Sequence, residues 1–282
     1  LVIGGWGTRG KSGTERLKAA LFEALGHGLL SKTTGCEAMF LQSFPMGKTR
    51  EMFLFRPFDK ATIWEHHNLM RQAAKGGADV FLWECMGLTP AYVKILQQSW
   101  SKDDYSTITN TYPDHEDIQG PAGINIPEVM NNFIPKGKTL ITAEERMRPI
   151  LEQSAREKQT RLVGVDWLDS GLLTEDVLDR FPYQEHPANV ALVLELASQL
   201  QIEPDFALKE MADRVVPDLG VLKAFPRATQ KGRTLEFNNG MSANERIATL
   251  GNWQRMGFDD EDRVKEPGVL VSTLVNNRAD RV

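Results

Sequence analysis

Cysteine is scarce in this sequence, and long hydrophobic runs and an excess of positive charge are missing. The 282 residues include two cysteines, Cys36 and Cys85, which excludes a disulfide framework or a cysteine zinc cluster and favours a reducing compartment. The longest apolar run, residues 190–197, is interrupted by Glu195 and is far shorter than the roughly 20 residues of a membrane-spanning helix. Lys and Arg number 33 against 38 Asp and Glu, a net charge of −5. This balance argues against nucleic acid as a partner.

Short apolar runs alternate with helix-length amphipathic segments, a pattern that is typical of α/β domains with a mostly parallel sheet flanked by helices. We predict strands at 1–5, 79–85, 105–110, 139–143 and 161–165. Helices are predicted at 11–26, 62–75, 89–100, 126–133, 144–157, 187–201 and 205–214. In such folds, ligands bind at the carboxyl ends of the parallel strands.

A second, smaller domain is predicted to begin near residue 224, after a Pro- and Gly-containing break in the pattern. We assign residues 1–223 to the large domain and residues 224–282 to the small one, with a strand at 234–237, a helix at 243–256 and a strand at 268–275. The small domain stops soon after its last predicted strand, so we expect it to be incomplete. The strand-like opening of the chain also leads us to expect sequence upstream, where a membrane anchor could lie.

Residues 5–12, Gly-Trp-Gly-Thr-Arg-Gly-Lys-Ser, match the G-x-x-x-x-G-K-S/T pattern of a phosphate-binding loop. The glycines allow the backbone to turn so that its N–H groups surround phosphate oxygens. Lys11 can then reach the terminal phosphates, and the Ser12 hydroxyl can bind Mg²⁺. A predicted strand precedes the motif and a predicted helix follows it, as the mechanism requires. The sequence therefore predicts nucleotide binding.

Acidic residues follow two other predicted strands. Glu84 ends an apolar run, and a buried carboxylate needs a partner such as a metal ion, a lysine or a backbone donor. A structural ion pair or a helix-capping role is the alternative. His115 lies among three carboxylates at 114–117; neutral imidazole is a good metal ligand, whereas nearby carboxylates would raise its pKa if no metal were bound. The alternative there is a solvated acidic loop.

These elements together resemble the Mur ligase family, ATP-dependent amide ligases with a central phosphate-loop domain and a Rossmann-like C-terminal domain. Segments spread over nearly the whole chain are similar to one branch, the ligase subunit of poly-γ-glutamate synthase. They are residues 7–12, 31–35, 83–86, 108–110, 114–115, 185–192 and 276–281. The phosphate loop alone is generic, whereas the combination of K-T-T-G, E-H-P-x-N-V-A-L and N-N-R-x-D-R is specific.

The resemblance implies roles for individual residues. ATP and Mg²⁺ (or Mn²⁺) are the implied cofactors. The implied nucleotide contacts are Gly7, Thr8, Arg9, Gly10, Lys11, Ser12, Asn189, which would face adenine, and Asn239. The implied metal ligands are Ser12, Glu84 and His115, and the implied catalytic residues are Lys11, Glu84 and His115. The implied substrate contacts are Arg9, Thr34, Arg278 and Arg281, with ordinary surface ion pairs as the alternative for the last two.

Two positions depart from the family pattern. Mur ligases typically carry a carbamylated lysine about fifteen residues beyond the Asp-His pair, and this chain has no lysine between Asp104 and Pro135. Asn239 stands where many relatives have an acid, which puts a ribose or magnesium contact there in doubt.

The reaction implied by the resemblance is activation of a carboxylate as an acyl phosphate, followed by attack of an amine. The branch implies glutamate, joined through its γ-carboxylate to a growing poly-γ-glutamate chain. It also implies small membrane-protein partners, a place at the cytoplasmic side of the membrane, and homo-oligomerisation as an option. The alternatives are a peptidoglycan- or folate-type ligase, a phosphate-loop NTPase switch without ligase activity, and a non-catalytic nucleotide-binding scaffold.

Replacing Lys11 by alanine tests the phosphate-loop assignment. The methyl group of alanine cannot supply a positive charge at the γ-phosphate, so we expect Lys11→Ala to lower nucleotide turnover by on the order of 10²-fold or more. Turnover is measured as phosphate release by a variant whose folding is verified by circular dichroism. Wild-type rates in that variant would remove the assignment.

Overall fold

The computed structural model describes residues 1–35, 37–56, 61–86, 89–168, 173–243, 246–259 and 267–275. The chain divides into two compact units, Leu1–Ser242 and Ala243–Val282. The sequence predicts that a second domain begins near residue 224. The division into two compact units does not test that boundary, which stays a prediction. No helix among the described residues is both long enough and apolar enough to cross a bilayer.

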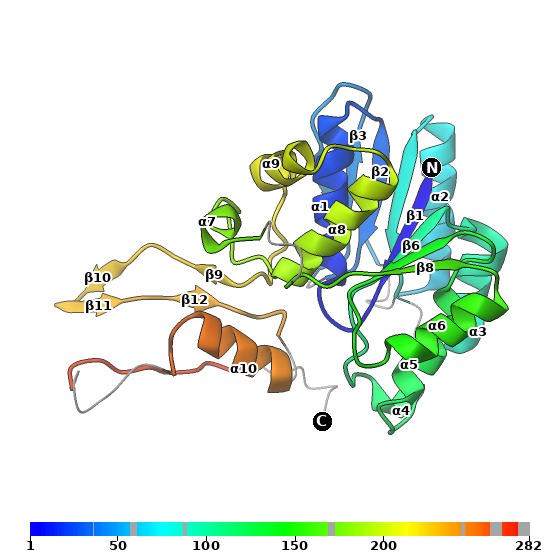
Figure 1. Cartoon of the computed structure of the whole chain (residues 1–282). Helices are drawn as coiled ribbons and strands as arrows, with labels where there is room; N and C mark the ends of the chain where they lie inside the picture. The colour runs from blue at the N-terminus through cyan, green and yellow to red at the C-terminus, as the bar shows by residue number, and fades with distance from the viewer. Residues whose placement is uncertain are drawn as a thin grey trace. The chain divides into compact units, whose positions relative to one another are not determined.

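An eight-stranded sheet forms the centre of the first unit, in the order β4-β3-β2-β5-β1-β6-β7-β8 (Figure 1). Its strands are β1 (Val2–Trp6), β2 (Leu29–Thr33), β3 (Met39–Ser43), β4 (Arg50–Phe53), β5 (Val80–Glu84), β6 (Tyr105–Ile108), β7 (Thr139–Thr142) and β8 (Arg161–Gly164). The pairings from β2 through β5 and β1 to β8 are all parallel, whereas β3 and β4 extend the sheet by antiparallel pairing. The predicted, mostly parallel α/β sheet is confirmed.

Helices cover both faces of this sheet. They are α1 (Lys11–Ala24), α2 (Ile63–Lys75), α3 (Pro90–Lys94), α4 (Glu116–Gln119), α5 (Asn125–Met130), α6 (Arg148–Glu157), α7 (Glu175–Leu178), α8 (Pro187–Gln199) and α9 (Pro204–Arg214). Alternation along β5 assigns the faces, because Phe81 and Trp83 pack with α2, α5 and α6, whereas Val80 and Leu82 pack with α1 and α8. A further apolar cluster joins α1, α8 and α9.

The structure corrects several predicted elements. The strands β2, β3 and β4 were not predicted, because polar and charged residues interrupt their apolar pattern. The predicted helix at 89–100 is a short α3 that continues as a π-helix, η1 (Ile95–Ser101). Residues 268–275 form no strand in the described structure, so that prediction was wrong. A strand requires a neighbour to accept its hydrogen bonds, and none is formed there.

The residues after 222 form short antiparallel pairs and one helix. Strand β9 (Lys223–Ala224) pairs with β12 (Asn238–Asn239), and β10 (Ala228–Gln230) pairs with β11 (Arg233–Leu235), the strand predicted at 234–237. Helix α10 (Arg246–Arg255) lies within the helix predicted at 243–256.

Two glycines in the central strand β1 make room for buried charged groups on opposite faces of the sheet. A Cβ atom at Gly4 would overlap Asp103 and the Trp83 ring, and one at Gly5 would overlap Glu15. Asp103 accepts hydrogen bonds from Trp83 Nε1 at 2.7 Å and from Gln97 Nε2 at 2.8 Å. Burial raises the pKa of Asp103 to about 7 although these hydrogen bonds oppose the shift. A larger side chain at Gly4 or Gly5 would therefore displace buried polar groups that pack against the strand leading into the phosphate loop.

We expect Gly4→Ala to lower the free energy of unfolding by about 1–3 kcal/mol, because the added methyl group overpacks the contact between Asp103 and Trp83. Urea denaturation, monitored by tryptophan fluorescence, measures this change in the free energy of unfolding. Gly251→Ala is the matched control, since a Cβ there meets no described atom within 4 Å and helix α10 favours alanine over glycine. Equal unfolding midpoints for the two variants would contradict the expectation.

Candidate active site

The register of the central strands brings three chain segments to one edge of the sheet. In the parallel pairings of β1, Gly5 lies opposite Glu84 of β5, and Trp6 lies opposite Ile108 of β6. The phosphate loop after β1, the end of β5 and the segment after β6 therefore meet at the carboxyl end of the sheet (Figure 1). This is the edge at which parallel α/β sheets bind ligands.

The phosphate loop has the backbone shape that its glycines predicted. Gly7 has φ of 139° and Gly10 has φ of 82°, which are conformations that residues with a Cβ rarely adopt. A Cβ at Gly7 would also overlap Thr109 Oγ1, and one at Gly10 would overlap Asn189 Oδ1. Gly10 forms the N-cap of α1, so the N–H groups of the first helical turn face the loop.

The segment after β6 holds the phosphate loop in place by hydrogen bonds. Asn110 bonds to the loop three times: its carbonyl accepts from Thr8 N at 3.1 Å, its Oδ1 from Arg9 N at 2.9 Å, and its Nδ2 donates to Arg9 O at 3.1 Å. Thr8 Oγ1 donates to Tyr112 O at 2.6 Å. The asparagine of the T-N-x-x-x-D-H pattern therefore fixes the loop conformation, a role that the spacing alone did not reveal.

Lys11 folds over the loop, and its Nζ donates to Thr8 O at 3.0 Å. Burial lowers the pKa of Lys11, while the charge of Glu84 opposes that shift. The carbonyl of Thr8 and the charge of Glu84 thus hold this ammonium group at the loop, where it can reach a phosphate bound there.

Glu84 is buried and finds its partners in two other segments. Its Oε2 accepts from Ser12 Oγ at 2.7 Å and from Thr34 N at 2.7 Å, and its Oε1 accepts from Thr34 Oγ1. The predicted candidates Ser12, Glu84 and Thr34 are therefore brought together. These hydrogen bonds stabilise the carboxylate, and among the described residues no Lys, Arg or His forms an ion pair with it at hydrogen-bonding distance.

Arg9 and His115 lie on either side of Asp114. Arg9 Nη1 is 3.2 Å from Asp114 Oδ2, and His115 Nε2 is 3.8 Å from the same oxygen. His115 adopts a left-handed φ of 49°, and its carbonyl oxygen accepts from the backbone amides of Ile118 and Gln119, the last two residues of α4. The phosphate-loop arginine is thereby tied to the loop that carries the predicted metal-binding histidine.

Asn189 lies against the phosphate loop on the side of α8. Its Nδ2 donates to Glu185 Oε1 at 2.9 Å, and Glu185 also accepts from the Tyr183 hydroxyl. Since a carboxylate can only accept, Glu185 fixes the amide with its Oδ1 toward Gly10. The sequence identified Asn189 through the resemblance but gave no role to Glu185.

Of the three remaining predicted site residues, the structure describes Asn239. Asn239 Nδ2 donates to Leu219 O at 2.8 Å and to Val221 O at 3.3 Å, so this amide ties β12 to the 219–221 loop. Arg278 and Arg281 lie outside the described residues, and their predicted substrate contacts stay predictions.

The donor set at Glu84 suits a magnesium ion. Mg²⁺ prefers hard oxygen ligands, takes one or two from the protein, and keeps waters and phosphate oxygens for the remaining positions. Glu84 and the Ser12 hydroxyl supply such oxygens within 2.7 Å of each other. Among the described residues, no three His, Cys, Asp or Glu side chains form a ready-made cluster. Such a site would therefore depend on the nucleotide for its remaining ligands.

Sequence reasoning also missed Glu144, which follows β7. Its carboxylate accepts from Thr111 N at 2.6 Å, Thr111 Oγ1 at 2.9 Å and Met147 N at 3.0 Å. Glu144 thereby supports the segment that fixes the phosphate loop. Its position directly after a predicted strand was the available signal, as it was for Glu84.

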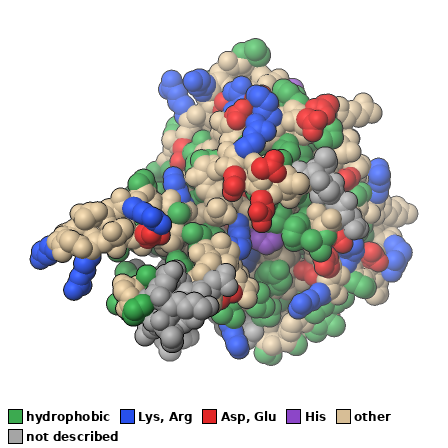
Figure 2. All heavy atoms as spheres, turned by 60° about the vertical axis from the view of Figure 1, so that its left-hand side comes forward, with side chains coloured by type: hydrophobic (Ala, Val, Ile, Leu, Met, Phe, Trp, Pro, Cys, Tyr) green, Lys and Arg blue, Asp and Glu red, His purple; other side chains and the backbone are tan. Residues whose placement is uncertain are grey.

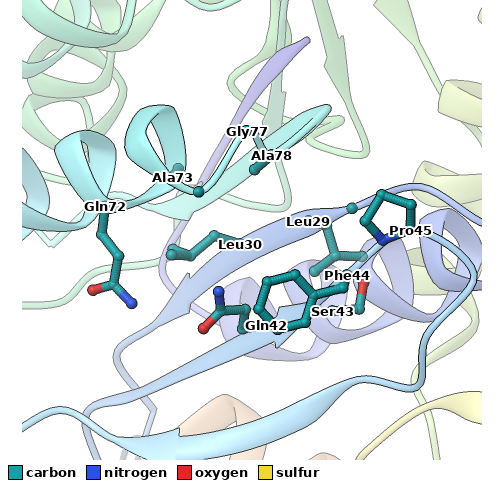
Figure 3. A pocket seen from close by; sticks show the side chains of 12 residues that line it. Leu29, Leu30, Gln42, Ser43, Phe44, Pro45, Gln72, Ala73, Gly77 and Ala78 are labelled. Carbon is teal, nitrogen blue, oxygen red and sulfur yellow. The ribbon is translucent and has the colours of Figure 1, made fainter.

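A shallow pocket elsewhere in the sheet does not belong to this site. Gly28, Leu29 and Ala78, at the amino ends of β2 and β5, form part of its wall, with Gln42 and Gln72 on opposite sides (Figure 3). Glu84 lies at the other end of β5. Lys and Arg side chains are interspersed with Asp and Glu over the face in Figure 2, which shows no broad basic field.

Comparison with known proteins gives matches over nearly the whole chain. Residues 224–282 match the family described as poly-gamma-glutamate synthase CapB C-terminal domain. The chain is 29% identical to PGA synthase CapB of Bacillus subtilis (strain 168), over 98% of this chain and 67% of that protein. It is 28% identical to the capsule biosynthesis protein CapB of Bacillus anthracis, over 98% of this chain and 57% of that protein. The chain thus spans between about half and two thirds of these relatives.

Solved structures share the fold. Escherichia coli FolC in complex with DHPP and ADP superposes with a TM-score of 0.58 at 18% identity, covering 80% of this chain and 59% of that one. A bifunctional folylpolyglutamate synthase/dihydrofolate synthase with Mn, AMPPNP and L-glutamate bound gives 0.57 at 17% identity, covering 80% and 60%. These structures confirm the predicted fold, and the sequence relatives and the family match confirm the resemblance to the ligase subunit of poly-γ-glutamate synthase.

Glu84→Gln tests whether the buried carboxylate binds metal. The amide oxygen can still accept from Thr34 N, and the amide NH₂ can donate to Thr34 Oγ1, but the side chain lacks the charge that attracts a cation. We expect the Mg²⁺ or Mn²⁺ concentration for half-maximal nucleotide turnover to rise by on the order of 10-fold or more, with little change in the melting temperature. His115→Ala should act in the same direction. A lower melting temperature with an unchanged metal titration would favour a structural role for Glu84.

Proposed function

We propose that this chain is the ATP-binding part of a ligase that activates a carboxylate as an acyl phosphate and joins it to an amine. The observation that carries the proposal is the meeting of Ser12, Thr34 and Glu84, one residue from each of three family segments, at the phosphate loop. The similarity to proteins named PGA synthase CapB and capsule biosynthesis protein CapB supports glutamate as the substrate, joined through its γ-carboxylate.

The residues of the site account for the phosphoryl transfer. The loop amides and Lys11 would bind the terminal phosphates of ATP, with Gly7 and Gly10 keeping the backbone close to them. As the carboxylate of the substrate attacks the γ-phosphorus, the bond from this phosphorus to the bridging oxygen breaks and ADP leaves, while Lys11 stabilises negative charge on the transferring group. An amine then attacks the carbonyl carbon of the acyl phosphate, and inorganic phosphate leaves. The contribution of the protein is mainly positioning and electrostatic stabilisation.

Ser12, Glu84 and His115 are the residues that would hold divalent metal ions. Bound there, Mg²⁺ or Mn²⁺ would neutralise charge on the phosphates. Solved structures of the same fold include one with Mn, AMPPNP and L-glutamate bound. No lysine occurs between Asp104 and Pro135, so we infer that water or substrate oxygens take the place of a carbamylated lysine.

Further assignments extend this proposal. Asn189 would contact adenine, as the family resemblance implies, and Glu185 fixes its side chain beside the phosphate loop. Thr34 and Arg9 would face the substrate carboxylate. Asn239, Arg278 and Arg281 would contribute from the C-terminal side. We also propose a place at the cytoplasmic face of the membrane beside small membrane-protein partners, with homo-oligomerisation as an option.

Product analysis tests the proposal. Protein, ATP, Mg²⁺ and glutamate are combined, together with the membrane partners if they are needed, and phosphate release and the linkage of the product are determined by mass spectrometry. We expect phosphate to appear in proportion to γ-linked glutamate, with Lys11→Ala as the inactive control.

Other outcomes identify the alternatives. Phosphate release without any amide product would indicate an NTPase switch. Stimulation by another amino acid, a folate or a peptidoglycan precursor, but not by glutamate, would overturn the poly-γ-glutamate assignment and leave a general Mur-type ligase.

A further inference from the structure

Two cations share a single carboxylate beside the candidate active site. Lys32 of β2 is fully buried, and its Nζ lies 3.2 Å from Glu65 Oε1 of α2. Arg56, which follows β4, donates from Nε to Glu65 Oε2 and from Nη2 to Glu65 Oε1, both at 2.9 Å. The Lys32–Arg56–Glu65 cluster therefore carries one more positive than negative charge.

The other close neighbours of the cluster are neutral. Met86 Sδ lies 3.1 Å from Lys32 Nζ and 3.9 Å from Arg56 Nη2. Burial and the charge of Lys32 lower the pKa of His66 well below its usual range, so this neighbouring imidazole of α2 is uncharged at neutral pH. Glu84 acts on Lys32 through space, but its oxygens accept from Ser12 and Thr34. The charge of Glu84 offsets that of Lys32, so these four groups together carry no excess positive charge. Arg56 differs from Lys32 because Glu65 is its one carboxylate partner among the described residues.

The position of the cluster relates it to the reacting groups. Lys32 lies in β2, and Thr34 follows the last residue of that strand, Thr33. Thr34 bonds to Glu84, and Met86 follows Glu84 by two residues along the chain. The cluster thus lies beside Glu84, on the side of β5 that pairs with β2 rather than with β1.

Arg56 provides the access to this site. Its side chain is 22% exposed, compared with 0% for Lys32 and 10% for Glu65. Among the described residues, the hydrogen bonds of Arg56 start from Nε and Nη2, which leaves the two N–H groups on Nη1 for a ligand. Guanidinium groups recognise carboxylates well, because their N–H groups match the carboxylate oxygens in spacing and charge.

We propose that Arg56, positioned by Glu65 next to the buried Lys32, forms a binding site for a carboxylate of the γ-glutamyl substrate. The inference rests on the proposed function. Amide formation through the γ-carboxyl group leaves the α-carboxylate of each glutamate free, so the growing chain carries one negative charge per residue. The cluster binds one of these α-carboxylates and so aligns the end of the substrate that lies beside Glu84. This carboxylate belongs either to free glutamate or to the chain.

Binding measurements test the site independently of turnover. The protein is titrated calorimetrically with glutamate and with tri-γ-glutamate in the presence of Mg²⁺ and a non-hydrolysable ATP analogue. We expect Arg56→Gln to weaken binding about 10-fold or more, because the ligand loses a charge-assisted hydrogen bond. Arg56→Lys should restore part of the affinity. Arg71→Gln, on an exposed part of α2, is the matched control and should bind as the wild type does.

A ligand series on the wild-type protein covers the case in which the Arg56 variants fail to fold. Tri-γ-glutamate with its α-carboxylates converted to amides should bind the wild type about 10-fold or more weakly. The same amide should show no further loss in Arg56→Gln. A larger effect of Arg56→Gln on tri-γ-glutamate than on glutamate assigns the site to the chain, and the reverse assigns it to the free amino acid.

Two results overturn the proposal: equal affinity of Arg56→Gln and wild type, or an amide that binds wild type as well as the acid does. Failure of the proposed function has a different signature. In that case wild-type protein releases no phosphate in response to glutamate, whatever the binding titrations show.

Discussion

The parallel pairing of β1 with both β5 and β6 is the constraint on which the site depends. Because these strands run in the same direction, the residues that follow them meet at one edge, where Gly5 lies opposite Glu84 and Trp6 opposite Ile108. Three distant segments can then exchange hydrogen bonds. Asn110 fixes the phosphate loop, and Glu84 links that loop to Thr34 beyond it. A shift of register by one residue would turn the Glu84 side chain to the opposite face of the sheet and separate it from Ser12.

Buried charge is concentrated around this constraint, and each charged group has a compensating partner. On one face of β1, Glu15 pairs with Lys18, whose Nζ also donates to Thr107 Oγ1 at 2.8 Å; on the other, Asp103 accepts from Trp83 and Gln97. Both layers depend on glycine in β1, since any side chain there would displace them. A polar network of this kind is stable only when its members are satisfied, and it then holds the surrounding elements in one arrangement. The strand that leads into the phosphate loop is thereby held in one position.

The carboxyl edge of the sheet also has a charge pattern that suits an anionic reaction. Lys11 lies at the phosphate loop, and Arg56 lies beyond Glu84, beside Lys32. ATP and a polymer of γ-linked glutamate, the substrates proposed above, are both polyanions, so a ligase that transfers a phosphoryl group from one to the other needs cations on both sides of that group. The solved structures of the same fold show that this architecture is shared more widely. The charges beyond Glu84 belong to this chain, and they are where a preference for a polyanionic chain would arise.

The sequence by itself determined the parallel α/β core and the phosphate loop, because each can be recognised from contiguous residues. The loop follows from the motif at residues 5–12, and the core strands follow from short apolar runs. It also identified Glu84 and His115 from their positions at strand ends. The tertiary structure alone decided their partners. Strands β2 to β4 were missed, and with them the contact of Thr34 with Glu84 and the Lys32–Arg56–Glu65 cluster. A strand predicted at 268–275 was not formed. The pattern of apolar and polar residues within a segment indicates which of its own side chains are buried. Hydrogen bonds between distant side chains depend instead on which strands pair and in what register.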